Sequence, residues 1–249
     1  MSISVYCATL AWLLTLVQGR RRLVRTAAWA TALALALELA LIVLQAARGQ
    51  ASHYNISTPF DAAVFQVMGA TLPAIYGAAV VTAALLTRQR GLPAVLASGI
   101  RGSLIVCLLG MAQGSRMIGN GENAGPGMIG AHSVGGLDGG PGLPVTGWST
   151  EHGDLRVAHF VGLHALQLLP VLAWLLQRYV GRLNVRTQVR LVRLATVACA
   201  GVVTLLTWQA ERGLPLLGPD APVLAAAGLG TGLLAAMVAA VVAGDRRAA

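Results

Sequence analysis

Lysine is absent from this sequence of 249 residues, and charged residues of any kind make up only 11% of it. A retinal Schiff base needs a lysine amine, so a rhodopsin-type chromophore is excluded. Aromatic residues amount to 5%, whereas hydrophobic residues amount to 56%. Ordinary soluble domains do not have this composition, and apolar runs of about 20 residues are long enough to cross a bilayer. The sequence therefore predicts an all-α, polytopic membrane protein.

Several chemical signatures are also missing. The chain has only three cysteines, Cys7, Cys107 and Cys199, and they lie far apart in apolar segments. We therefore expect small buried side chains rather than disulfides or metal ligands. No Walker motif, no H-E-x-x-H zinc motif and no C-x-x-C-H motif for covalent haem is present. The net charge of +9 does not indicate nucleic-acid binding, because the arginines gather in a few loops.

Seven apolar segments are long enough, or nearly long enough, to span a bilayer, and they form one transmembrane domain over residues 1–249. They cover residues 2–17, 26–47, 61–86, 93–113, 157–180, 191–209 and 221–243. The first segment has no basic residues before it and no evident cleavage site. We therefore expect a retained span rather than a signal peptide.

Arginines alternate between the two sides of the predicted membrane. They lie in or beside the connections that follow the first, third and fifth segments, and after the last: Arg20, Arg21, Arg22, Arg25, Arg88, Arg90, Arg178, Arg182, Arg186, Arg190, Arg193, Arg246 and Arg247. Most acidic residues lie in the other connections. The positive-inside rule then predicts an N-terminus outside and a cytoplasmic C-terminus. A basic set made only of arginine is typical of GC-rich bacteria, so we expect the bacterial cytoplasmic (inner) membrane.

The basic residues between positions 178 and 193 form a separate feature. They recur at intervals of about four residues, which places them along one helical face. We expect this face to bind anionic lipid head groups. A cytoplasmic partner or a nucleotide is the alternative.

Two histidines, His159 and His164, stand near the start of the fifth segment. An ionisable side chain at membrane depth is costly and usually faces a protein interior or a cavity. At about 100° per residue the two rings point roughly 140° apart, so each could reach a different helix. They are either ligands of haem or a transition metal, or interior histidines that hydrogen-bond to their surroundings.

Other polar side chains concentrate in the outer half of the predicted bundle, which indicates an outward-facing pocket. Glu38 lies near the middle of the second segment, where it is a proton acceptor, a metal ligand or the ion-pair partner of Arg116 or Arg101. The predicted pocket residues are Glu38, Gln66, Gln113, Arg116, Arg156, Gln167 and Glu211.

A long connection at residues 114–155 is rich in glycine and histidine. Loops of this length in compact proteins are commonly lids or binding loops, so we expect it to cover the pocket. His132 and His152 could then join His159 and His164 as candidate cofactor ligands. The candidate metal ligands are His159, His164 and Glu38.

Three glycines in the seventh segment, Gly228, Gly230 and Gly232, include a G-x-x-x-G spacing. This spacing lets a second helix approach closely. The partner helix could belong to the same chain or to a second copy, so a homo-oligomer is one interpretation. A subunit of a larger membrane complex is another.

These features favour binding of haem or a transition metal for a redox or sensing role. A haem held by two side chains would need a second ligand from a loop histidine or a methionine, because the other predicted spans contain no histidine. A proton-coupled or small-solute transporter is one alternative. A membrane enzyme acting on a lipid or lipid-linked substrate is the other, with a histidine and Glu38 as acid and base.

Overall fold

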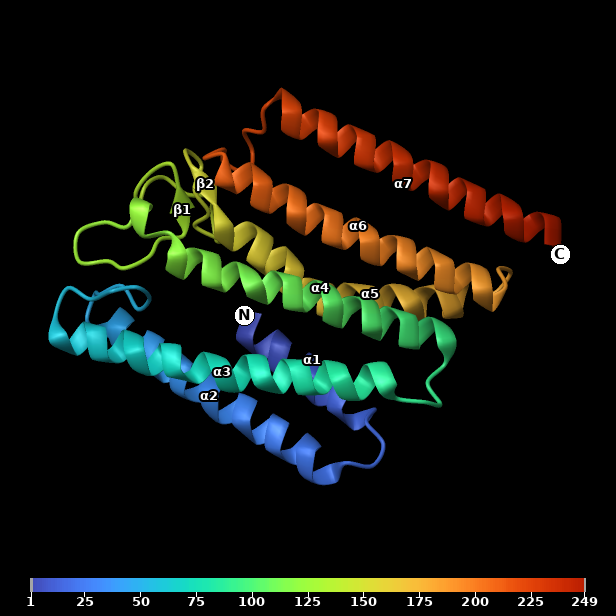
Figure 1. Ribbon diagram of the computed structural model, residues 1–249, viewed down its shortest axis with the longest axis horizontal. Helices are drawn as coiled ribbons and strands as arrows, with labels where there is room; N and C mark the ends of the chain where they lie inside the picture. The colour runs from blue at the N-terminus through green and yellow to red at the C-terminus, as the bar shows by residue number, and fades with distance from the viewer. Residues whose placement is uncertain (1, 249) are drawn as a thin grey trace.

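A computed structural model describes residues 2–248 and shows a bundle of helices (Figure 1). The helices are α1 (Ser2–Thr15), α2 (Arg21–Ala47), α3 (Pro59–Arg88), α4 (Ala94–Gly119), α5 (Leu155–Tyr179), α6 (Val185–Glu211) and α7 (Ala221–Ala248). The last six are long and apolar enough to cross a membrane. The predicted all-α, multi-pass membrane bundle is thus confirmed. The exact number of spans and the orientation of the termini stay predictions, because α1 has only 14 residues.

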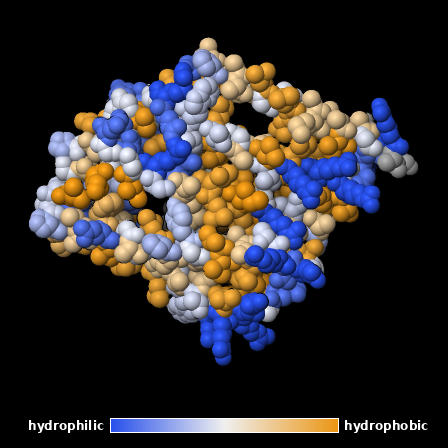
Figure 2. All heavy atoms as spheres, in the orientation of Figure 1, coloured by the Kyte–Doolittle hydropathy of each residue, from blue (hydrophilic) through white to orange (hydrophobic). Residues whose placement is uncertain are grey.

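The bundle has two chemically different ends. The connections that follow α1, α3 and α5 lie at the end shown on the right of Figure 1, which we name the arginine end. The longer connections that follow α2, α4 and α6 lie at the opposite end, which we name the loop end. Hydrophilic side chains gather at both ends of the molecule, with a broad apolar surface between them (Figure 2). This is the distribution that a bilayer imposes on a spanning protein.

Helices α4, α5 and α6 form the closely packed half of the bundle. Gly110 of α4 and Gly162 of α5 bring two helix backbones into direct contact, since a Cβ on Gly110 would lie 2.7 Å from Gly162 Cα. Gly99 makes a similar approach to α5, where its Cβ would lie 2.8 Å from the Leu169 carbonyl oxygen. Small residues of this kind hold helices together in a bilayer, where apolar burial drives little association.

The glycines of α7 make no close helix contact within the described chain. A Cβ added at Gly228, Gly230 or Gly232 would meet no atom within 4 Å. Helix α7 packs along α6 at the edge of the bundle, apart from α1–α5 (Figure 1). The expectation of a close helix approach within the chain is therefore wrong for α7. It is Gly110 and Gly162 that make such an approach.

The long connection between α4 and α5 is folded against the loop end. It contains a short 3-10 helix, η1 (Gly121–Asn123), and two short strands, β1 (Ser133–Val134) and β2 (Gly153–Asp154), which pair antiparallel. Asp154 caps α5 by accepting a hydrogen bond from the backbone amide of Arg156 at 3.0 Å. The three cysteines carry free thiols, but only Cys107 is buried as expected, whereas Cys7 and Cys199 are partly exposed.

Candidate functional site

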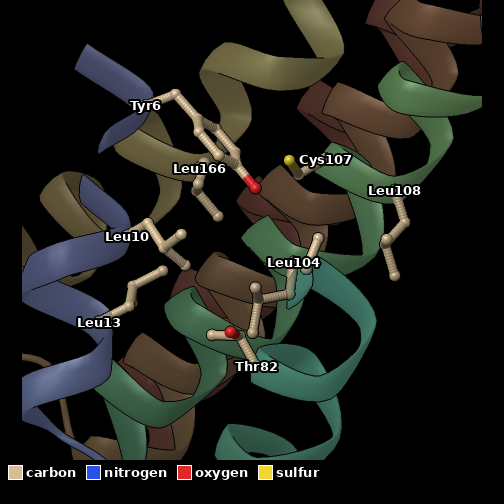
Figure 3. Close-up of a pocket in the computed structure, with 9 residues that line it drawn as sticks. Tyr6, Leu10, Leu13, Thr82, Leu104, Cys107, Leu108 and Leu166 are labelled. Atoms are coloured by element: carbon tan, nitrogen blue, oxygen red, sulfur yellow. The ribbon is translucent and has the colours of Figure 1, made fainter. Parts of the chain in front are cut away.

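A cavity of about 720 Å³ lies in the loop-end half of the bundle, between α2 and α3 on one side and α4 and α5 on the other. Helix α1 fills the other half of this space. Its 14 residues span about 21 Å, whereas the 30 residues of α3 span about 45 Å. Tyr6 of α1 lines the cavity at its floor. The Tyr6 side chain points toward Cys107 (Figure 3). On the side of Tyr6 away from the cavity, the bundle encloses only a small void of about 10 Å³.

The walls of the cavity are mainly apolar, and its polar residues come mainly from the loop end. The apolar lining includes Leu35, Phe65, Met68, Leu72, Ile75, Met111, Met117 and Leu163. The polar lining includes Glu38, His53, Tyr54, His132, Arg156 and His159. Pockets of this size that combine apolar walls with a few convergent polar groups bind small molecules. The lining is therefore suited to an amphipathic ligand.

His159 has a fixed orientation in this cavity. Its Nδ1 lies 2.8 Å from the backbone carbonyl oxygen of Gly110 on α4. A carbonyl oxygen only accepts hydrogen bonds, so Nδ1 carries the proton. Nε2 then keeps its lone pair, which is the arrangement of histidines that bind metals in proteins. The ring is therefore held in one orientation on the cavity wall.

Glu38 faces His53 rather than an arginine. Its Oε1 lies 3.8 Å from His53 Nε2, and both residues line the cavity. Of the two expected partners, Arg116 forms an ion pair with Glu211, and Arg101 donates a hydrogen bond to the Gln89 carbonyl. His53 was expected only as one of the loop histidines that could supply a second haem ligand, because sequence spacing does not relate its short polar connection to Glu38. Only the fold of the α2–α3 connection brings this histidine over the carboxylate.

Residues 53–56 and 127–132 together cover the cavity at the loop end, and we name them the roof. The Tyr54 carbonyl accepts a hydrogen bond from Ile129 N at 2.9 Å, and Ile56 N donates to the Gly127 carbonyl at 2.8 Å. Burial raises the pKa of Tyr54 to about 12, so its phenol is neutral at physiological pH. The Tyr54 and His132 rings contact edge to face, with centroids 5.2 Å apart.

Asp138 fixes the His132 part of the roof. Its carboxylate accepts hydrogen bonds from His132 N at 2.9 Å and from Ser133 N at 2.7 Å, and it lies 2.9 Å from His132 Nδ1. Partial burial raises the pKa of Asp138, but these hydrogen bonds outweigh the burial and hold it well below its usual range. Asp138 is therefore ionised in the folded loop.

Because the pKa of Asp138 is lowered in the folded protein, we expect the long loop to lose order in acid. A carboxyl group with a lowered folded pKa stabilises the fold above its unfolded value of about 3.9, and that contribution disappears as the pH falls through the folded pKa. We expect Asp138→Asn to speed hydrogen exchange at the His132 and Ser133 amides about tenfold at neutral pH, because a lost charged hydrogen bond is worth roughly 1.5 kcal/mol. Exchange mass spectrometry in nanodiscs measures this. Glu122→Gln, in the same loop, serves as the control, and equal exchange in both variants would contradict the role of Asp138.

Several predicted residues lie outside the cavity lining. His164 bonds its own helix through Nδ1, 2.7 Å from the Phe160 carbonyl, and stacks on the Phe160 ring with centroids 3.9 Å apart. His152 packs against Gly136 in the long loop. Five further predicted pocket residues also lie outside the lining. Gln66 is exposed and Gln113 is buried. Gln167 donates a hydrogen bond to Thr9 of α1, and Arg116 pairs with Glu211.

The candidate metal ligands are not gathered at one point. Within residues 2–248, no three His, Cys, Asp or Glu side chains lie close enough together to hold a metal ion. His159, His164 and Glu38 therefore do not form the metal site that the sequence led us to expect.

Comparison with known proteins adds no function to this geometry. No protein-family model, no curated protein and no solved structure matches the chain. Function must therefore be argued from the cavity itself.

Proposed function

We propose that this protein binds an amphipathic ligand in the cavity, with His159 holding the polar or metal centre of that ligand. The observation that carries the proposal is the His159 ring, tied to the Gly110 carbonyl at 2.8 Å and left with Nε2 as its free nitrogen on the cavity wall. The apolar walls would receive the body of the ligand. The polar groups near the roof would contact its head.

Haem is the ligand that uses this arrangement most fully. Its iron needs an axial ligand such as a neutral imidazole, and a methionine thioether is an established second one. Three methionines, Met68, Met111 and Met117, line the cavity and are buried. Arg156 lines the cavity too and offers a cation for propionate groups. Haem would support the redox or sensing role that the histidines suggest.

A membrane enzyme acting on a lipid or lipid-linked substrate is the second candidate. It is favoured by the Glu38–His53 pair, since a carboxylate and an imidazole 3.8 Å apart need only a small approach, or one bridging water, to exchange a proton. A transporter for a water-soluble solute receives less support. The roof ties two loops together over the cavity, and the apolar walls offer a polar solute few partners.

The alternation of arginines supports a definite placement of the bundle. We place the loop end outside the bacterial cytoplasmic membrane and the arginine end in the cytoplasm. The arginines of residues 178–193 do not share one helical face, because α5 ends at Tyr179 and α6 begins at Val185. They are nevertheless all exposed at the arginine end: Arg178, Arg182, Arg186, Arg190 and Arg193. This supports binding to anionic lipid head groups there. In this orientation the cavity lies on the outer side.

The first experiment is an absorption spectrum of protein purified in mild detergent, oxidised and reduced, with lipid extraction and mass spectrometry on the same sample. We expect a Soret band, its loss in His159→Ala, and its retention in His164→Ala. His164 is a matched control, because it is a histidine of the same helix that lies outside the cavity lining.

Each result decides between the candidates. A colourless protein that retains a stoichiometric lipid in wild type but not in His159→Ala would exclude haem and favour the lipid enzyme. A protein that carries neither haem nor lipid would contradict the proposal. Equal retention in His159→Ala and His164→Ala would show that His159 is only a structural residue.

A further inference from the structure

The cavity reaches the surface of the bundle between α3 and α4. Three of its lining residues are exposed, namely Pro73 on α3 and Ser115 and Ile118 on α4. The lining residues deeper in the bundle, such as Met68 and Met111, are buried. The lining residues that are exposed thus stand on the two helices that flank one side of the cavity, whereas the roof residues His53 and His132 are partly exposed.

The spacing of α3 and α4 has a local cause. The Tyr76 hydroxyl donates a hydrogen bond to the Met111 carbonyl, which fixes the two helices together near mid-length. Toward the loop end the helices diverge (Figure 1), and the molecular surface is hollowed between them (Figure 2). Small residues stand on both sides there, Gly69 on α3 and Gly114 and Ser115 on α4. We name the gap between Gly69 and Ser115 the lateral opening.

The lateral opening faces the part of the surface that a bilayer covers. Gly69 lies ten positions inside the start of α3 at Pro59, about 15 Å along the helix, so it stands at the depth of the hydrocarbon core. Meanwhile the roof joins residues 53–56 to residues 127–132 by hydrogen bonds at the loop end. A ligand that used the lateral opening would never have to cross the roof.

We propose that the ligand passes between the cavity and the bilayer through the lateral opening, so it is an amphiphile dissolved in the leaflet at the loop end. This rests on the proposed function and narrows its ligand to lipid-soluble molecules with an apolar body. Polar solutes are excluded from this route, because hydrocarbon on one side and apolar walls on the other would desolvate them.

Gly69 makes the opening testable without disturbing the fold. A Cβ at this position would meet no atom within 4 Å, so a larger side chain would extend into the opening. Gly77 is also in α3 and equally free of contacts, but it does not line the cavity. Gly77→Leu is therefore a matched control for Gly69→Leu. Ser115→Leu blocks the opening from the opposite helix.

The test uses a long-chain fatty acid with a mid-chain diazirine, offered in phosphatidylcholine vesicles that contain the protein. Photolysis at increasing times after mixing, followed by peptide mass spectrometry, measures adducts on buried lining residues such as Met68 and Met111. We expect wild type and Gly77→Leu to label at the same rate. We expect Gly69→Leu and Ser115→Leu to label about tenfold more slowly, within the usual range for changes in association rate.

The outcomes distinguish a failure of the proposed lateral route from a failure of the proposed ligand binding. Equal labelling rates in all variants, or no cavity adducts in wild type, would overturn the lateral route whether or not the protein binds haem. A lower final level of labelling at an unchanged rate would overturn it as well, because loss of volume alone explains that result. Failure of the proposed function would show separately, as unchanged ligand retention in His159→Ala.

Discussion

Gly162→Leu is expected to lower the free energy of unfolding by about 3 kcal/mol, toward the upper end for overpacked cores. A Cβ on Gly162 would overlap Gly110 Cα and lie 2.9 Å from Gly110 N, and both of these are backbone atoms. A backbone cannot turn aside as a flexible side chain can. Helices α4 and α5 would have to separate along their length. Unfolding by a denaturing detergent, followed by circular dichroism in mixed micelles, measures the loss.

The control for this variant is Gly230→Leu in α7. A Cβ at Gly230 would meet nothing within 4 Å, so the added side chain extends toward lipid. Leucine is a better helix former than glycine, so stability should stay the same or rise by up to about 1 kcal/mol. A large loss at Gly230 would show that α7 has a packing partner outside this chain. A small loss at Gly162 would contradict the close α4–α5 contact.

The same contact controls the candidate site. The Gly110 carbonyl that holds His159 belongs to the residue that Gly162 touches. Close approach of the two backbones therefore also sets the position of the imidazole on the cavity wall. Gly162→Leu should reduce ligand retention together with stability, whereas Gly230→Leu should change neither.

The membrane class of this protein could be predicted from its sequence with little ambiguity. Long apolar segments and clustered arginines leave few alternatives, and six helices that are long and apolar enough to cross a membrane support this class. Close helix packing was harder to locate. The glycines of α7 stand four residues apart in one helix, whereas Gly110 and Gly162 are 52 positions apart on two helices. Spacing within a helix reveals a small-residue face, but it does not show which helix lies against that face.

The candidate site could be predicted only in part, because spacing within one helix does not show which neighbouring element a side chain faces. Helix geometry indicated that His159 and His164 point in different directions, and in the structure only His159 reaches α4. Helix geometry could not indicate which of the two histidines faces a cavity, because the position of the cavity depends on how α1 packs against its neighbours. His53 could be named from the sequence as a loop histidine, but its contact with Glu38 could not be predicted, since it depends on how the α2–α3 connection folds back.

Asp154→Ala is expected to lower the free energy of unfolding by about 3 kcal/mol, because it removes an N-cap worth about 1 kcal/mol and charged hydrogen bonds to a partly exposed arginine worth about 2 kcal/mol. The Asp154 carboxylate is fully buried and lies 2.6 Å from Arg156 Nη2. It also accepts hydrogen bonds from Arg156 N and, at 2.9 Å, from Ser149 N. One side chain thus starts α5, fixes the end of the long loop and orients a cavity residue. Thermal unfolding in nanodiscs measures the change.

Asp154→Asn separates these contributions. Asparagine is as good an N-cap as aspartate, so this variant should keep the start of α5. It should lose only the negative charge at position 154 that pairs with Arg156. Arg156 is about one-third exposed, at 34%, and water screens part of that loss. We therefore expect Asp154→Asn to be less destabilised than Asp154→Ala and to keep the ligand more weakly than wild type. If the two variants were equally unstable, the ion pair rather than the cap would hold the first turn of α5, and with it the helix that carries His159.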